Sequence, residues 1–317
     1  MAAGLVTVFG GSGFIGRYVV QRLAQQGWTV RVAVRRPDRC LFLKTMGVVG
    51  QVTPVAADLR SERAVSAAVA GADAVINLVG ILYERGSRNF QTIHVDGAER
   101  AARLARAAGA KVFVQMSALG AGDDAPADYA RSKAAGEAAV RRHFPDARVI
   151  RPSIVFGPED GFFNKFAAMA RFAPALPLIG GGRMKFQPVY VGDVAEAILR
   201  CVEDPATAGK TYELGGPGVF TFAELLRRTL QEIGRHRLLL PLPFGIARVQ
   251  AAVMEWLPVP PLTRDQLKLL ERDNVVSPGA LTLADLGIQA QGLDAILPTY
   301  LARYRPGGRI GRRANAH

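Results

Sequence analysis

The strongest constraint on the fold of this chain is a glycine-spaced turn close to its start. The run "LVTVFGGSGFIGRYVVQRLAQQG" predicts a strand, a turn and a helix, because a β-branched stretch gives way to apolar residues at helical spacing. Gly10, Gly13 and Gly16 stand at intervals of three within the turn. This spacing permits a tight bend, a close approach of backbone N–H groups to a pyrophosphate, and close packing of helix on strand. We therefore predict a dinucleotide site whose helix opens with Phe14 and Ile15.

The order of the predicted elements indicates the fold class. Strand-like runs alternate with helical patterns through the first two hundred residues, which favours an α/β fold with a parallel sheet. A chain of 317 residues can bury a large core. We expect a Rossmann-type doubly wound parallel sheet with a smaller C-terminal lobe.

The second predicted strand, "WTVRVAV", bears on the choice of cofactor because Arg35 and Arg36 follow at its end. A site selective for NAD would place Asp or Glu near this point to bind the ribose 2′-hydroxyl. Two guanidinium groups suit a 2′-phosphate instead. We predict NADP(H) in preference to NAD(H); a solvated basic loop is the alternative interpretation.

Further cofactor contacts are expected at strand ends, where a doubly wound sheet holds its ligand. Asp58 and Leu59 follow the third strand and suit the adenine ring and its amino group. The residues after the fourth strand are expected to follow the cofactor backbone, and they are Asn77, Leu78, Val79 and Gly80.

A candidate acid/base group comes from the fifth strand and the next helix. The strand "KVFVQMSALGA" ends at Ser117, and the helix "DYARSKAAGEAAVRRHF" carries Tyr129 and Lys133 four residues apart, on one face. Lys133 could bind the nicotinamide ribose and lower the phenol pKa, and Tyr129 could exchange a proton with a carbonyl or alcohol oxygen held by Ser117. An exposed surface pair is the alternative.

These motifs together resemble the short-chain dehydrogenase/reductase superfamily, in its extended or atypical branch. "RPSIVFGP" and "FQPVYVGDVAEAI" are similar to that branch as well. Longer stretches, among them "PLIGGGRMKFQPVYVGDVAEAI" and "LTRDQLKLLERDNVV", resemble the thirty-nine-kilodalton accessory subunit family of respiratory complex I, in its bacterial form. This closer resemblance covers nearly the whole chain.

The resemblance implies domain boundaries, because chains of this branch leave the Rossmann core after "RPSIVFGP" and rejoin it near "FQPVYVGDVAEAI". It also adds Pro152 to the expected cofactor-binding residues. The expected parts are a Rossmann domain (1–157 with 187–216), a smaller substrate or partner lobe (158–186 with 217–302) and a basic flexible tail (303–317).

The resemblance also implies a function. Mitochondrial members of the subunit family bind NADPH as structural or assembly subunits near the quinone site, without established turnover, and relatives are linked to ubiquinone biosynthesis. We expect an NADPH-binding accessory or assembly protein associated with complex I or ubiquinone metabolism. The alternatives are a free NADP-dependent oxidoreductase for an apolar or quinone-like carbonyl or alcohol, using Ser117, Tyr129 and Lys133, and a sugar-nucleotide epimerase. The epimerase alternative lacks clear diphosphate-binding residues.

One residue departs from the superfamily pattern. His94 in "QTIHVDG" stands where many active members carry the Asn of an N-V-x-G segment, which helps to hold the active-site lysine through water. A helix residue tied to nearby backbone is the simpler interpretation of His94. A proton relay remains open, because the imidazole titrates.

Composition narrows the remaining possibilities. A net charge of +13 favours contact with anionic phospholipid or an acidic partner subunit, and no motif for nucleic acid accompanies it. Cys40 and Cys201 are expected to be free thiols, and the four histidines form no ligand-spaced cluster for a metal. The predicted strand that begins at residue 5 leaves no room for a signal peptide, so none is expected. No apolar run is long enough to span a bilayer. We expect a cytoplasmic protein, peripheral on the cytoplasmic face of the inner membrane.

The stretch 238–262, "LLLPLPFGIARVQAAVMEWLPVPPL", predicts a helix bracketed by prolines. Its larger apolar side chains fall on one side, and they are Ile246, Val249, Val253, Trp256 and Leu257. A buried core helix is the simpler interpretation. An interfacial or partner-binding helix is the alternative.

Overall fold

The computed structural model describes residues 4–308 and divides them into two compact units. Unit 1 holds residues 4–152, 192–214 and 278–288. Unit 2 holds residues 153–191, 215–277 and 289–308. The chain therefore leaves unit 1 and returns to it twice.

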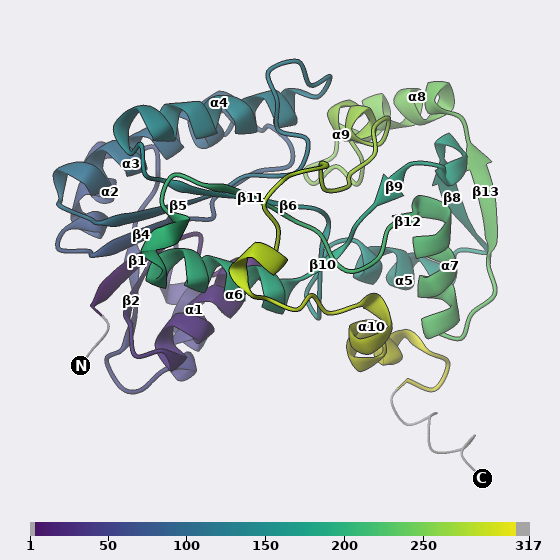
Figure 1. The fold of residues 1–317 in the computed structure, drawn as a ribbon. Coiled ribbons are helices and arrows are strands. Elements are labelled where there is room, and N and C mark those ends of the chain that lie inside the picture. Colours follow the sequence, from purple (N-terminus) through teal and green to yellow (C-terminus); the bar gives the residue numbers. More distant parts are fainter. Residues whose placement is uncertain (1–3, 309–317) are drawn as a thin grey trace, which may run out of the picture. The chain divides into compact units, whose positions relative to one another are not determined.

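Unit 1 is built on a parallel sheet with seven strands in the described residues (Figure 1). In chain order the strands are β1 (Leu5–Phe9), β2 (Thr29–Val34), β3 (Val52–Ala56), β4 (Ala74–Asn77), β5 (Val112–Met116), β6 (Arg148–Pro152) and β11 (Thr211–Leu214). Across the sheet the order is β11-β6-β5-β4-β1-β2-β3, with every neighbouring pair parallel. The order reverses at β1, so the predicted doubly wound sheet is confirmed.

Helices cover both faces of this sheet (Figure 1). One face carries α2 (Glu62–Val69), α3 (Asp96–Ala107) and α4 (Asp128–His143), and the other carries α1 (Phe14–Gln25) and α6 (Val191–Glu203). Shorter helical turns are η1 (Pro37–Met46), η2 (Gln91–Val95), η4 (Pro205–Thr207) and η5 (Ala284–Leu286). With both faces covered, strand residues of either direction are buried, which is why these strands read as continuous apolar runs.

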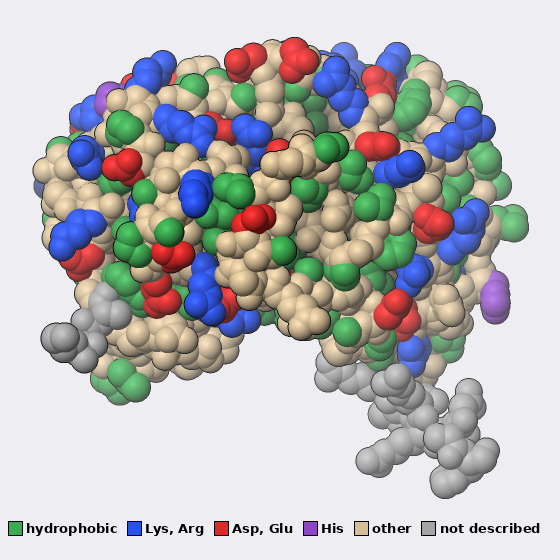
Figure 2. All heavy atoms as spheres, in the orientation of Figure 1, with side chains coloured by type: hydrophobic (Ala, Val, Ile, Leu, Met, Phe, Trp, Pro, Cys, Tyr) green, Lys and Arg blue, Asp and Glu red, His purple; other side chains and the backbone are tan. Residues whose placement is uncertain are grey.

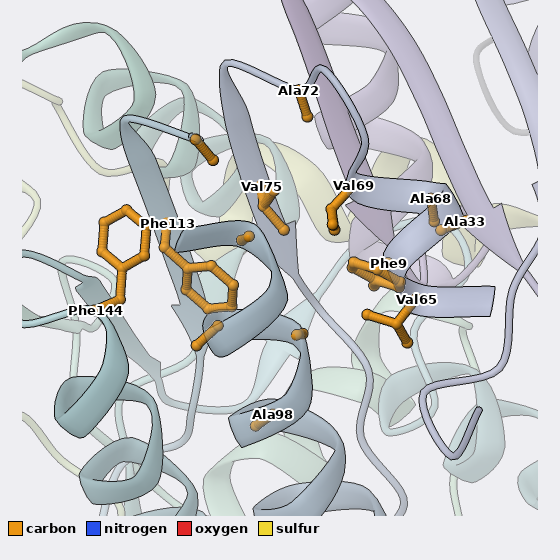
Figure 3. Close-up of a cluster of buried hydrophobic side chains, with 14 of the residues drawn as sticks. Phe9, Ala33, Val65, Ala68, Val69, Ala72, Val75, Ala98, Phe113 and Phe144 are labelled. Atoms are coloured by element: carbon orange, nitrogen blue, oxygen red, sulfur yellow. The ribbon is translucent and has the colours of Figure 1, made fainter. Parts of the chain in front are cut away.

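The core under α2 and α3 explains how closely these helices approach the sheet (Figure 3). The inner face of α3 is made of alanines that are fully buried, namely Ala98, Ala101, Ala102 and Ala105. Phe9, Val75 and Phe113 on the strands fill the space that these small residues leave. The layer holds the carboxyl ends of β1, β4 and β5 at one edge of the sheet, where the predicted site residues lie.

Unit 1 also includes a late segment that the sequence pattern assigns to the smaller lobe. Residues 278–288 lie with unit 1, because Leu281 forms a bridge with Tyr212 on β11 and its carbonyl accepts the Glu213 N–H at 2.8 Å. Conversely, residues 153–157, 187–191 and 215–216, which were expected in the Rossmann domain, lie with unit 2. Both differences come from backbone pairing between segments far apart in the sequence, which local patterns do not reveal.

Unit 2 combines helices with short strand pairs. Its helices are α5 (Phe163–Phe172), η3 (Gly180–Gly182), α7 (Phe222–Glu232), α8 (Phe244–Met254), α9 (Arg264–Leu269), α10 (Leu293–Leu301) and η6 (Ala302–Tyr304). The strand pairs in the described residues are β7 (Val155–Phe156) with β10 (Val189–Tyr190), β9 (Lys185–Phe186) with β12 (Phe220–Thr221), and β8 (Ala175–Ile179) with β13 (Leu238–Leu242). A buried aromatic group that includes Phe163, Phe186 and Phe222 joins these elements.

Two expectations about unit 2 need correction. The predicted helix in 238–262 exists as α8, but Ile246 and Val249 on it are exposed, so the buried-core interpretation is wrong for that side. The predicted flexible tail begins with fixed residues: Arg303 donates to the Pro158 carbonyl at 3.1 Å, and Arg305 donates to the Glu232 carbonyl at 2.6 Å. The rest of that tail, 309–317, lies outside the described residues.

Three general expectations can be set against the described residues. Cys40 and Cys201 are both buried and free. None of the helices between residues 4 and 308 has the length and apolar character that crossing a bilayer requires. In the same part of the chain, His, Cys, Asp and Glu side chains form no group of three or more that could hold a metal ion.

Candidate cofactor and acid/base site

The turn between β1 and α1 requires glycine at two of the predicted positions. Gly10 has a φ of +77°, a left-handed conformation that other residues rarely adopt. A Cβ atom at Gly16 would lie 2.4 Å from the Gly10 carbonyl oxygen and 2.6 Å from the Gly11 Cα, so no side chain fits there. The glycine spacing therefore reflects a tight turn with a helix packed directly on it, as the sequence predicts.

The N-terminus of α1 is suited to an anion. The first N–H groups of a helix have no acceptor within the helix. Gly13 occupies the N-cap and has no side chain to accept from them, and the first turn carries no acidic residue. By contrast, the Ser61 hydroxyl at the N-cap of α2 accepts from the Ala64 N–H. The donors of Phe14 and Ile15 thus stand at the positive end of the helix dipole, which fits a pyrophosphate.

Three arginines share the neighbourhood of Asp58. Arg60 donates to Asp58 in bidentate fashion, with Nη2–Oδ2 at 2.8 Å and Nε–Oδ1 at 3.0 Å. The hydrogen bonds and charge of Arg60, with a smaller effect of Arg35, hold the pKa of Asp58 below its usual value. Partial burial, followed by the charges of Arg35 and Arg60, lowers the pKa of Arg88. The guanidinium groups of Arg35, Arg60 and Arg88 therefore act on one another around a single carboxylate, which suits a further anion.

This group modifies the sequence-based expectations. Sequence reasoning missed Arg60 and Arg88, because they reach the group from separate loops. Arg36 follows Arg35 at the start of η1, where its carbonyl accepts from the Cys40 thiol at 3.2 Å. Asp58, expected at the adenine amino group, is held by Arg60 instead, and its contact with adenine stays a prediction.

The residues after β3 and β4 that are expected to contact the cofactor form hydrogen bonds within the protein. Leu59 is buried, and its carbonyl accepts from Arg100 at 2.5 Å. Asn77 is 1% exposed; its Nδ2 donates to Gln115 Oε1 at 3.0 Å and its Oδ1 accepts the Val79 N–H at 3.2 Å. Asn77 therefore shapes the turn that carries Val79. Its direct contact with a cofactor stays a prediction.

Gly80 and Lys133 meet at the end of this turn. A Cβ atom at Gly80 would lie 3.1 Å from Lys133 Nζ and 3.6 Å from His94 Nε2. Lys133 is buried at 5% exposure, and its Nζ donates to the Met116 carbonyl at 3.4 Å. Burial lowers the pKa of Lys133 to about 8, against the opposing charge of Glu137. The alternative of an exposed surface pair is wrong for Lys133, because its side chain is buried. Burial of an ammonium group costs free energy, and such groups cluster at functional sites.

Tyr129 packs beside the lysine within an aromatic group. Its ring meets Phe90 edge-on at 6.0 Å between centroids and His94 at 5.5 Å, and Lys133 Nζ lies 5.8 Å from its centroid. Burial raises the pKa of Tyr129 to about 12. The expectation that Lys133 lowers this pKa is not met in the structure, because burial of the phenol dominates. Tyr129 is therefore a neutral phenol near neutral pH, and its role as a proton donor stays a prediction.

Ser117 carries a hydroxyl that is poised for another polar atom. The residue is 4% exposed and comes directly after Met116, whose carbonyl accepts from Lys133. Its N–H donates to the Ile150 carbonyl at 2.7 Å, which fixes the backbone. Within residues 4–308 its Oγ has no hydrogen-bond partner. A buried hydroxyl left this way costs free energy, so the position fits the predicted substrate-oxygen contact.

His94 has both ring nitrogens engaged. The Ser132 hydroxyl donates to the Tyr129 carbonyl at 2.7 Å, so it accepts from His94 Nδ1 at 2.8 Å. His94 Nε2 in turn accepts the Ile81 N–H at 3.0 Å. Burial, followed by the charge of Lys133, lowers the pKa of His94 to about 2. The ring therefore stays neutral and ties helix to loop, which supports the structural interpretation over the proton relay.

Pro152 closes β6 and completes the predicted set. It is buried, and its carbonyl accepts the Leu119 N–H at 3.0 Å, which ties the end of β6 to the segment after Ser117. A cofactor contact at Pro152 stays a prediction. The structure thus brings Gly80, Tyr129 and Lys133 together beside the strand that ends before Ser117.

The doubly wound sheet, the glycine turn and the grouping of Tyr129 with Lys133 are typical of the extended short-chain dehydrogenases, and comparison with known proteins agrees. Residues 6–215 match the NAD dependent epimerase/dehydratase family, and the chain belongs to this family. The solved structure of MoeE5 in complex with UDP-glucose and NAD superimposes with a TM-score of 0.73 at 17% identity, covering 98% of this chain and 99% of that one. At this identity the likeness supports the fold alone.

Two proteins with higher sequence identity to this chain indicate its place within the family. The mitochondrial NADH dehydrogenase (ubiquinone) 1 alpha subcomplex subunit 9 of Arabidopsis thaliana is 40% identical over 319 residues, which cover 96% of this chain and 79% of the relative. The ceramide reductase of Caulobacter vibrioides is 33% identical over 256 residues, which cover 80% of this chain and 79% of the relative. The resemblance to the extended short-chain dehydrogenases and to the complex I subunit family is confirmed.

Proposed function

We propose that this chain is an NADP(H)-binding accessory or assembly protein of respiratory complex I. The observation that carries the proposal is the extent of its similarity to the plant subunit, 40% identity across 96% of the chain. The reductase relative is similar over a shorter part of the chain. An association with ubiquinone-synthesis proteins, and a position on the cytoplasmic face of the inner membrane, belong to the same proposal.

The cofactor in this proposal is NADP(H) rather than NAD(H). The first turn of α1 offers N–H donors for the pyrophosphate, beside the glycine turn. Arg35, with Arg60 and Arg88, offers positive charge for the 2′-phosphate that distinguishes NADP from NAD. Arg36 remains a predicted further contact. The carboxylate of Asp58 is satisfied by Arg60, so it does not oppose a phosphate as a free acid would.

In an accessory role, Lys133 retains the cofactor. Its ammonium would bind the nicotinamide ribose and compensate part of the cofactor's negative charge in the resting complex. Tyr129 remains a neutral phenol, since burial holds its pKa near 12. The bound nicotinamide supplies hydride chemistry, whether or not the protein uses it.

A free NADP-dependent oxidoreductase is the second candidate. The observation that favours it is the retained acid/base group: Ser117 Oγ has no partner within residues 4–308, and Tyr129 and Lys133 lie together. Ser117 would hold a carbonyl or alcohol oxygen and Tyr129 would donate its proton. An apolar or quinone-like carbonyl or alcohol is the proposed substrate class. A sugar-nucleotide epimerase is the variant of this candidate that the fold also allows.

Native electrophoresis of membranes from the source cells tests the accessory role. We expect the protein to co-migrate with the respiratory NADH dehydrogenase, and its deletion to lower the amount of assembled complex. Migration as a free protein, together with normal assembly in the deletion strain, would contradict the proposal. Purified protein should be assayed in parallel for NADPH oxidation with quinone and long-chain ketone acceptors, which tests the second candidate.

A further inference from the structure

Unit 2 exposes a group of large apolar side chains, close together in the sequence, that its own packing does not require. Of the fifteen exposed large hydrophobic side chains in the described residues, eight lie between 238 and 259. We call these eight the α8 face: Leu238, Leu240, Ile246, Val249, Val253, Trp256, Leu257 and Val259. Single exposed apolar residues scattered over a surface are ordinary, but their concentration in one short stretch of the chain marks a surface that another body covers.

The orientation of α8 is the first argument. Ala247 and Ala251 are fully buried, packed in a small cluster with Leu267. Val249 and Val253 point the other way and are each 68% exposed. A helix that only packed against its own domain would bury its large residues and expose small or polar ones. In α8 this arrangement is reversed, so its large residues are available to contact a partner outside unit 2.

The same surface continues onto β13. This strand pairs with β8, beginning at Leu238 opposite Ala175, and Leu238 is 68% exposed. The Leu238 N–H donates to the Pro174 carbonyl at 3.3 Å, which brings the strand start next to the end of α5. Phe172 in the last turn of α5 is 83% exposed. The apolar surface therefore spans several elements rather than one frayed helix.

Basic residues border this surface. Arg171 stacks on the Phe172 ring at 5.3 Å and Arg237 donates to the Ala170 carbonyl at 2.9 Å, while Arg248 on α8 is paired with Glu271 at 2.5 Å. The stretch 234–261 holds three arginines and one glutamate, and Glu255 is paired with Arg264 at 2.9 Å. Figure 2 shows green hydrophobic side chains and blue Lys and Arg side chains together over α8 and β13. Apolar residues bordered by arginine match a bilayer surface with anionic headgroups.

We propose that the α8 face docks unit 2 on a bilayer that contains anionic phospholipid. Trp256, 91% exposed, enters the headgroup boundary together with Val249 and Val253. The bordering arginines lie over the phosphates. A symmetric contact between two copies would set these same arginines against one another, which their charge opposes. This inference deepens the proposed position on the inner membrane and rests on it for its biological setting. The residues of the α8 face all lie in unit 2, so it is independent of the cofactor site.

Vesicle binding by the full chain tests the inference. We would use phosphatidylcholine vesicles with and without phosphatidylglycerol, and measure co-sedimentation at low and high salt. The chain has two tryptophans, so Trp28→Phe leaves Trp256 as the one reporter. We expect binding to the anionic vesicles, weakened by salt, with the Trp256 emission shifted to shorter wavelength. Failure of the unmodified chain to bind either vesicle would overturn the inference.

Matched variants separate the α8 face from general apolar exposure. Val249→Asp with Val253→Asp should weaken vesicle binding by roughly tenfold or more, since charged groups replace inserted apolar ones. Val48→Asp with Val49→Asp is the control, because these valines of unit 1 are equally open at 73% and 105%. The control should bind like the unmodified chain. Equal loss in both pairs would overturn the inference.

Two further measurements complete the test. Trp256→Gln, beyond the end of α8, serves as the second variant if the aspartates unfold the helix, and it should weaken binding in the same direction. Sedimentation velocity would detect a dimer; a dimer that Val249→Asp with Val253→Asp dissolves, without any vesicle binding, identifies a second copy as the occupant and overturns the inference. NADPH binding, measured on every variant, reports separately on the proposed function.

Discussion

At the residue scale, Lys133 shows that unit 1 gives up stability at the site. Its pKa is lowered by burial to about 8, below the usual value for lysine. The unfolded chain therefore binds the proton more tightly than the folded one. At pH 7 this difference destabilises the fold by roughly 3 kcal/mol, and the loss is relieved as the pH rises from about 8 towards the unfolded value. A destabilising buried charge of this kind is typical of functional sites, which fits a role of Lys133 in binding the cofactor.

Lys133→Met should therefore make the protein without cofactor more stable and bind NADPH less well. Removing the buried charge should raise the unfolding free energy at pH 7 by about 1–3 kcal/mol. Losing a charge-assisted hydrogen bond should weaken NADPH binding by roughly tenfold or more. Denaturant unfolding and calorimetric titration measure the two effects. Lys111→Met, at an exposed position of the same unit, is the control; unchanged NADPH binding in Lys133→Met would contradict the cofactor role.

His94 should make stability depend on pH. Its folded pKa is about 2, whereas an unfolded histidine titrates near 6.5, so the unfolded state takes up a proton first. Stability due to His94 is complete above about 6.5 and falls as the pH drops below it, by roughly 2 kcal/mol at pH 5. A His94→Gln variant should lack this component, although it loses stability at neutral pH. Parallel denaturation of both proteins from pH 7 to 5 would show it; identical slopes would mean that folding does not lower the pKa of His94.

The arginine group makes a prediction about cofactor choice. Replacing Arg35 and Arg88 by Gln should weaken NADPH binding by an order of magnitude or more and leave NADH binding nearly unchanged. Each charge-assisted contact to phosphate contributes on the order of 1.5–3 kcal/mol. Arg227→Gln, an exposed arginine in α7, is the matched control. Equal affinity of the unmodified protein for the two cofactors would rule out this assignment.

Sequence reasoning reached some site residues and could not reach others. Tyr129 and Lys133 follow from helical spacing, and Arg35 follows from its place at a strand end. Arg60 and Arg88 escaped because an arginine in a loop has no local signature of what it faces. The raised pKa of Tyr129 depends on burial by Phe90 and His94, which is a property of the folded packing.

At the scale of elements, one close contact fixes α4 against the helical turn η2. A Cβ atom at Gly136 would lie 2.1 Å from the His94 carbonyl oxygen. Gly136 stands three residues after Lys133, on the same face of α4. The absence of a side chain at Gly136 therefore sets how closely Tyr129 and Lys133 approach the loop after β4.

Gly136→Ala should consequently disturb the site although it adds a single methyl group. Overpacking of this kind costs about 1–3 kcal/mol, and displacement of α4 should lower NADPH affinity as well. Gly245→Ala is the control, since Gly245 lies in α8 with open space at its Cβ and alanine favours a helix. Thermal unfolding and NADPH titration of both variants test this. A Gly136→Ala variant as stable as Gly245→Ala would show that α4 can move freely.

The helix in 238–262 shows where element prediction from sequence ends. Its existence and its apolar side follow from periodicity. The direction of that side does not, because a buried stripe and an exposed stripe have the same spacing. Ala247 and Ala251, the buried positions, are the least informative residues in the pattern.

At the scale of the whole molecule, the sequence supports the doubly wound sheet and the smaller lobe but not the full path between them. The glycine turn and alternating elements suffice for the sheet. The return of residues 278–288 to unit 1 depends on the bridge from Leu281 to Tyr212, between segments about seventy positions apart. No local propensity encodes such a pairing.

At the scale of the whole molecule, a variant that lacks only the Tyr129 hydroxyl, studied in the cell, distinguishes the accessory role from the reductase role most clearly. Tyr129→Phe should leave the fold and NADPH retention intact, because the phenol is neutral and its ring packing against Phe90 and His94 is preserved. If the chain acts as an accessory protein, complex I assembly and activity should be normal. If it is a reductase, turnover should fall by roughly a hundredfold or more, since the general acid is missing. Blue native gels, NADPH content and growth on respiratory substrates measure this. A severe growth defect with a normally assembled complex would decide for the reductase, whose oxygen substrate Ser117 would then hold.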